Sequence, residues 1–183
     1  MNRENVSASK PKVTGSIFRG ANGTALPTDA KSKLNEAFAD IGYIGDSGLT
    51  NSTELETGVV KAWGGDVVLN WREGKKDLFK FKMIEILNPE VLKAVHGDAN
   101  VEGTLAAGIT VKVNNADEAE HSWVFDMIFK GGAPKRIVVP SAAVTAIGDV
   151  VYVGKDAVGY EITLTASADT DGNTHYEYIG GAV

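Results

Sequence analysis

Residue types that could do chemistry gather in one short segment of the chain: Glu54, Glu56, Lys61, Trp63 and Trp71. Paired carboxylates can serve as acid and base when their environments differ, and carbohydrate sites place exposed aromatic rings over paired acids. If the segment is one continuous strand, however, alternation places Trp63 on the face opposite the two glutamates. On a threonine-rich hairpin interrupted by glycine, we expect the two carboxylates to be solvated.

The histidines and one acidic loop offer little further chemistry. His96, His121 and His175 show no metal-ligating spacing such as HExxH. The segment 169–177 begins like a calcium loop, but Thr174 stands at the sixth position, where such a loop requires glycine. Nucleophile-elbow, phosphate-loop and dinucleotide motifs do not occur in the sequence. We therefore predict no catalytic, metal or cofactor site, and a protein that is not an enzyme.

Hydrophobic alternation predicts the elements that position these residues. We expect a mainly β, antiparallel sandwich or barrel with one flanking α-helix at about 88–96. The helix is indicated by Asn88 as N-cap, Pro89 at the first position and Gly97 at the end. Strands are expected over 13–19, 77–87, 104–114, 121–130, 135–140, 149–154 and 159–167.

Three further segments complete the expected structure. A turn or short helix is expected over 29–39. The segment 50–58 is expected to be a mobile acidic hairpin or loop, and Lys61–Val68 a core strand that Gly64 and Gly65 bend at a bulge.

Composition and length limit the classes of protein. The 183 residues suffice for one domain with one core, and cysteine is absent, which excludes disulfides and thiolate sites. The sequence lacks an apolar run of the roughly 18 residues that a membrane span needs. The N-terminus lacks a signal-peptide core, so we expect a soluble protein made in the cytoplasm, with no membrane partner.

Charge divides the chain unevenly. Residues 1–33 carry a net charge of +4, and the remaining residues carry −10. We expect residues 1–12 to form a flexible basic arm and 13–183 a single domain. Arg3, Lys10 and Lys12 would then dock on the acidic body of a neighbouring copy, unless the arm is merely a solvated tail. An acidic body argues against tight nucleic-acid binding.

Four phrases in the first half of the chain resemble the major tail protein of long-tailed bacteriophages, the tail tube protein. They are GSIFRGANGTALPTDA, LNEAFADIGYIGDSGLTNSTE, KAWGGDVV and LNPEVLKAVHG, and together they span about residues 15–97. The second half is similar in pattern, with a long aromatic strand and a GGAPKRIVVP hairpin. The resemblance implies a β-sandwich that forms hexameric rings, which stack into a tube through which DNA passes during ejection.

The same resemblance implies partners and a location. The subunit would contact copies of itself, the tail terminator, the tape measure and the distal tail proteins, and would reside in the virion tail after synthesis in the host cytoplasm. Family members reach the adjacent ring with an N-terminal segment and a long loop, so Glu54, Glu56 and Lys61 are expected at the lumen or between rings. One alternative is the tube of a related injection device without DNA cargo. Another is a carbohydrate-binding or hydrolytic β-sandwich.

Overall fold

Eleven strands, one α-helix and one short 3-10 helix make up the part of the chain that the structure describes. This computed structural model describes residues 5–12, 16–116 and 118–181. The elements are β1 (Ser9–Pro11), β2 (Ile17–Ala21), β3 (Ala39–Asp40), β4 (Thr50–Lys61), β5 (Val67–Met83), α1 (Pro89–His96), η2 (Asp98–Asn100), β6 (Val101–Thr104), β7 (Gly108–Val111), β8 (His121–Phe129), β9 (Pro134–Ile147), β10 (Tyr160–Ser167) and β11 (Tyr176–Ile179).

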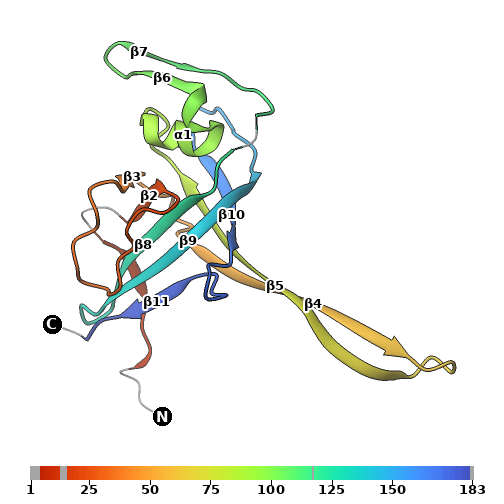
Figure 1. Cartoon of the computed structure of the whole chain (residues 1–183). Coiled ribbons are helices and arrows are strands. Elements are labelled where there is room, and N and C mark those ends of the chain that lie inside the picture. Colours follow the sequence, from red (N-terminus) through yellow and green to blue (C-terminus); the bar gives the residue numbers. More distant parts are fainter. Residues whose placement is uncertain (1–4, 13–15, 117, 182–183) are drawn as a thin grey trace.

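Nine strands form one antiparallel sheet that curls over on itself. Its main order is β3-β2-β8-β9-β10-β5-β4, with β1 paired to β8 and β11 paired to β9 (Figure 1). Strands β5 and β8 are not neighbours in this order, yet Phe79 of β5 stacks on Phe125 of β8 with ring centroids 5.4 Å apart. The sheet therefore faces itself across a core, as in a sandwich. The prediction of a mainly antiparallel β-fold with one flanking helix is confirmed.

Helix α1 covers one end of this core. Asn88 Oδ1 accepts a hydrogen bond from the Glu90 backbone N–H at 3.0 Å, and Gly97 ends the helix with φ of 88°. Val91, Ala94 and Val95 are buried against the sheet. The expected helix, with both of its caps, is confirmed, because its signals are local in sequence.

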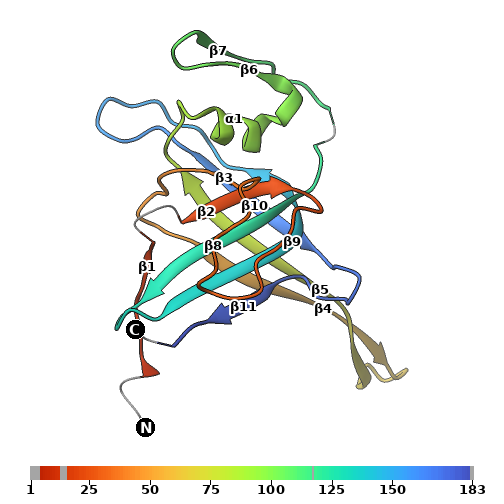
Figure 2. The ribbon, with the colours of Figure 1, turned by 60° about the vertical axis from the view of Figure 1, so that its left-hand side comes forward.

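The segment 22–38 covers the opposite face of β8 and β9, where it crosses the two strands (Figure 2). Asp126 and Arg136 lie on this face, and both are buried beneath the segment. Arg136 donates to both Asp126 carboxylate oxygens, at 2.6 and 2.8 Å, and to the backbone oxygens of Asp29 and Ser32, each at 3.0 Å. The buried ion pair thus anchors the covering segment to the sheet.

Several expected elements differ from those observed. The segment 149–154 is not a strand but a loop, in which Val151, Tyr152 and Val153 are exposed. The strand expected over 104–114 is instead a small hairpin of β6 and β7, since the chain turns at residues 105–107. An apolar alternation alone cannot distinguish a strand from a loop whose apolar side chains face solvent.

Other boundaries also shifted. Of the two alternatives expected over 29–39, a turn or a short helix, residues 29–38 show the turn together with bends. The strand expected to end at Leu87 ends at Met83, and Leu87 is exposed. The strand expected at 13–19 is observed from Ile17, and residues 13–15 lie outside the described part. Among the described residues, helices of the length and apolarity that a bilayer crossing requires are absent.

Candidate assembly surfaces

The long hairpin of β4 and β5 leaves the body as an arm, seen at the lower right of Figure 1. Pairing continues from Thr50 opposite Lys80 to Lys61 opposite Val67. The segment 50–58 is therefore one strand of a hairpin, which is the first of the two expected alternatives, and its register shifts between Glu56 and Thr57. Gly64 and Gly65 lie in the turn at the tip, where Gly65 has φ of 94° and donates its N–H to Ala62 O at 2.8 Å. They close a hairpin and do not bend a core strand, because the chain reverses at them between the paired residues Lys61 and Val67.

The tip of the arm is apolar and solvent-exposed. Trp63 is fully exposed in the turn, and the strands beside it expose further large apolar side chains, namely Val59, Val60, Val67, Val68, Leu69 and Trp71. A concentration of exposed large apolar side chains of this kind is typical of protein–protein contact sites. The arm tip is defined here as residues 59–71.

Trp71 and Gly58 form a second feature of the arm that the sequence analysis missed. Gly58 is the one buried residue of β4, and it lies directly opposite Trp71. A Cβ atom at Gly58 would lie 2.4 Å from the Trp71 ring, so the ring rests on the bare backbone of the glycine. The glycine lets an aromatic ring cover the strand, which stiffens an arm that has no core of its own.

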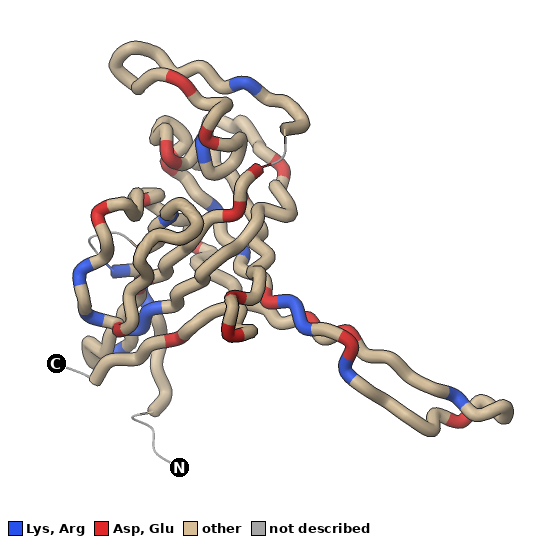
Figure 3. Tube along the Cα trace, viewed as in Figure 1, with Lys and Arg blue, Asp and Glu red and all other residues tan. Residues whose placement is uncertain are grey.

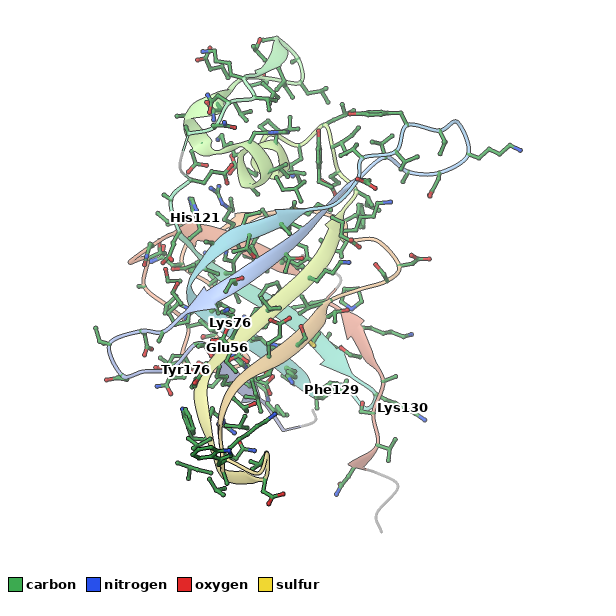
Figure 4. The ribbon with its side chains drawn as sticks, turned by 90° about the vertical axis from the view of Figure 1, so that its right-hand side faces the viewer. Glu56, Lys76, His121, Phe129, Lys130 and Tyr176 are labelled. Atoms are coloured by element: carbon green, nitrogen blue, oxygen red, sulfur yellow. The ribbon has the colours of Figure 1, made fainter. Side chains whose placement is uncertain are left out.

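The predicted residues Glu54, Glu56 and Lys61 all lie on β4 and are exposed. Glu54 lies opposite Lys76, and Glu56 forms an ion pair with the same lysine, as Figure 4 shows. The two carboxylates therefore share a cation and do not form an isolated acidic pair. Trp63 lies beyond the end of the strand, so the candidate carbohydrate residues do not converge on one face.

A buried carboxylate fixes the base of the arm. Asp77 is fully buried and accepts a hydrogen bond from Thr53 Oγ1 at 2.6 Å and another from Thr174 Oγ1. Lys75 Nζ lies 2.8 Å from its Oδ2 atom, and His175 Nδ1 lies 3.5 Å from the same oxygen. Burial opposes ionisation, but Lys75 and the two threonines outweigh it and lower the pKa of Asp77 to about 2. Asp77 thus joins β4, β5 and the segment before β11.

Because the pKa of Asp77 falls from 3.8 to about 2 on folding, its contribution to stability is present above pH 3.8. The contribution of Asp77 to the free energy of unfolding is about 2 kcal/mol. This contribution is lost as the pH falls from 3.8 through 2. We expect Asp77→Asn to remove this dependence, as measured by urea unfolding between pH 1.5 and 5. Asp66→Asn, which removes the same charge at the arm tip, is the control. Equal pH dependence in Asp77→Asn and wild type would contradict the assignment.

The N-terminal segment lies along the body over its described residues. Ser9–Pro11 pairs with β8, and Lys12 Nζ lies 3.7 Å from Asp126 Oδ2. Lys10 is exposed, and Arg3 lies outside the described residues. The two described residues of the predicted docking arm are therefore brought together on one edge of the sheet.

The remaining candidates for chemistry have structural partners. Asp169 Oδ1 accepts from the backbone N–H groups of Asp171 and Asn173, at 3.0 and 2.9 Å, which makes the calcium-like segment a turn. His121 Nε2 lies 2.7 Å from an Arg19 guanidinium nitrogen. Groups of acidic and histidine side chains that could hold a metal ion are absent from the described part of the chain.

A family model described as phage tail tube protein matches residues 4–182. The chain belongs to the phage tail tube protein family. The match covers nearly the whole chain, including the arm and the folded-over sheet. No curated protein gives a significant match.

Membership makes the chain a structural component of a phage tail tube. The arm tip, Gly58 under Trp71 and the Asp77 anchor are the features that sequence reasoning missed. The run of apolar residues on both sides of Gly64-Gly65 was the available signal for the tip.

Proposed function

We propose that this chain is the repeating subunit of the tail tube, and that it forms hexameric rings stacked around a channel for DNA. The observation that carries the proposal is the arm, whose apolar tip projects from a body that already has its own core. If a contact with another chain buried a large apolar side chain of the arm tip, that side chain would stabilise the contact by about 1.5–3 kcal/mol. A neighbouring copy is the partner that a self-assembling tube supplies.

The charge distribution supports a conduit. Residues 34–183 carry a net charge of −10, and an acidic channel wall would repel the phosphates of passing DNA. Both signs of charge occur along the arm (Figure 3), and Glu56 is paired with Lys76. We therefore place Glu54, Glu56 and Lys61 at a contact between copies, where both signs find partners.

The ends of such a tube need other proteins. In this proposal the last rings contact the tail terminator and the distal tail proteins. The tape measure occupies the channel while the channel holds no DNA. The finished tube resides in the virion tail.

Negative-stain microscopy of concentrated purified protein tests the proposal. We expect rings or tubes with a central channel wide enough for duplex DNA to pass. A protein that stays monomeric at all concentrations and is stabilised by sugars in a thermal-shift assay would instead support the carbohydrate-binding alternative.

A further inference from the structure

Asn22 and Gly23 form an exposed tight turn directly after β2, and they are the sole Asn-Gly pair in the sequence. The Thr24 N–H closes the turn by donating to Ala21 O at 3.0 Å. Gly23 has φ of 88°, which a type II turn requires at its third residue. Ala21 lies opposite His121, which Figure 4 labels at the start of β8. The turn therefore lies in solvent at the edge of the folded body.

An asparagine followed by glycine can modify itself in water. A bond forms between Gly23 N and Asn22 Cγ, the Cγ–Nδ2 bond breaks, and the amide nitrogen leaves as ammonia with the proton from Gly23 N. Water then opens the cyclic imide at either carbonyl, which gives aspartate or isoaspartate. Glycine favours the attack because it has no side chain to block it. Apart from its chain neighbours, the described residues place no atom within 4 Å of the point that a Cβ atom of Gly23 would occupy.

A chain of hydrogen bonds connects the Asn22 side chain to the sheet. Asn22 Nδ2 donates to Ser141 Oγ of β9 at 2.8 Å. The Ser141 hydroxyl donates to one Glu120 carboxylate oxygen, and Ser167 Oγ donates to the other at 2.7 Å. Ser141 and Ser167 lower the pKa of Glu120 against the effect of burial, so Glu120 is ionised at neutral pH. Because Ser141 gives its one proton to Glu120, it needs a donor such as the Asn22 amide on its other side.

Conversion of Asn22 reverses the role of its side chain. A carboxylate at position 22 accepts hydrogen bonds and donates none. It would face a Ser141 hydroxyl whose proton is already held by Glu120, so two negative charges would compete for one donor. Isoaspartate also adds a methylene group to the main chain of a turn that a single backbone bond closes. Both products therefore weaken the attachment of the turn to β9.

We propose that Asn22-Gly23 is a site of spontaneous deamidation, that the bond to Ser141 slows the reaction, and that the product releases the turn from β9. The Ser141 bond restrains the reaction because ring closure requires the Asn22 side chain to leave Ser141 and swing towards Gly23 N. The reaction needs only the folded subunit. The inference therefore goes beyond the proposed tube and does not depend on it.

Mass spectrometry of the digested protein tests the reaction after the folded protein has been kept at mildly alkaline pH. Trypsin cleaves after Arg19 and Lys31, so one peptide carries Asn22 as its only side-chain amide. Conversion appears as the mass change from amide to carboxylate, and chromatography separates aspartate from isoaspartate. We expect Asn22 to react at least about tenfold faster than Asn173, an exposed asparagine followed by the branched Thr174. Equal rates at the two asparagines would overturn the site.

Ser141→Ala tests the restraint, because it removes the acceptor of the Asn22 amide. We expect conversion at Asn22 to become about two- to tenfold faster, as the loss of one ordinary hydrogen bond gives, with the rate at Asn173 unchanged. The matched control is Ser167→Ala, which removes the other donor to Glu120 but keeps the acceptor of Asn22. Its rate should equal that of wild type. An unchanged rate in Ser141→Ala would show that Ser141 does not restrain Asn22.

Asn22→Asp reproduces one product directly and tests its effect on the turn. At neutral pH we expect this variant to lower the midpoint of urea unfolding more than Asn22→Ala does, because Asn22→Ala removes the amide donor without adding a charge. Hydrogen exchange of the Thr24 amide, whose bond closes the turn, should also be faster in Asn22→Asp than in Asn22→Ala. Equal midpoints and equal exchange rates in the two variants would overturn the release of the turn.

Discussion

Asp126→Ala should lower the free energy of unfolding by about 3–5 kcal/mol, the cost of leaving a buried charge without its partner. Arg136 is fully buried and donates to both oxygens of Asp126. Its remaining bonds, to Asp29 and Ser32, keep it under the segment 22–38 and prevent it from reaching water. Urea unfolding at neutral pH measures the change.

Two further variants define the origin of the effect. Asp126→Ala/Arg136→Met removes both charges and should recover a large part of the lost stability, because replacing both partners by apolar groups is often nearly neutral. Glu102→Ala breaks the exposed ion pair with Lys112 and should leave the unfolding curve unchanged. A loss below 1 kcal/mol in Asp126→Ala would show that the pair does not anchor the covering segment.

Val60→Glu/Leu69→Lys should abolish tube growth while leaving the subunit folded. The two residues lie directly opposite each other at the arm tip, so the new charges can pair across the hairpin and maintain it. Removing two apolar contacts of about 1.5 kcal/mol or more each raises the concentration needed for assembly by at least about 100-fold. Sedimentation of tubes over a concentration series measures this threshold.

The control for the arm tip is Leu105→Glu. Leu105 is also exposed, but it lies in the turn between β6 and β7 at the other end of the molecule. Its replacement should leave the threshold near that of wild type. If Val60→Glu/Leu69→Lys assembles at the wild-type concentration, the arm tip does not carry the contact between copies.

Local signals predicted the parts of the fold that depend on near neighbours in the chain. The caps of α1, the Gly131-Gly132 turn between β8 and β9, and the alternation in Phe79, Phe81 and Met83 all match the structure. The cap bonds and the turn join residues a few positions apart, and the strand is indicated by spacing along the chain, although Phe79 packs on the distant Phe125. The apolar loop 149–154 was assigned wrongly because its residue types suit a strand although no strand lies beside it.

The candidate surfaces were predicted in part. Glu54, Glu56 and Lys61 were placed on a hairpin and are exposed on β4, while their assignment to the lumen or to an inter-ring contact stays a prediction. Lys76 as the partner of Glu56 was not foreseen, because 20 residues separate the two in sequence. The docking role of Lys10 and Lys12 also stays a prediction.

The sequence by itself determined a mainly β chain, one capped helix, a basic N-terminal segment on an acidic body, and the resemblance to tail tube proteins. These properties follow from residue type, spacing and order. The tertiary structure alone decided that the segment 50–71 stands outside the core as an arm, since exposure depends on what else packs nearby. It also decided that Asp77 and Asp126 are buried, because Thr53 and Thr174, which donate to Asp77, and Arg136, which pairs with Asp126, lie on other segments that only folding brings together.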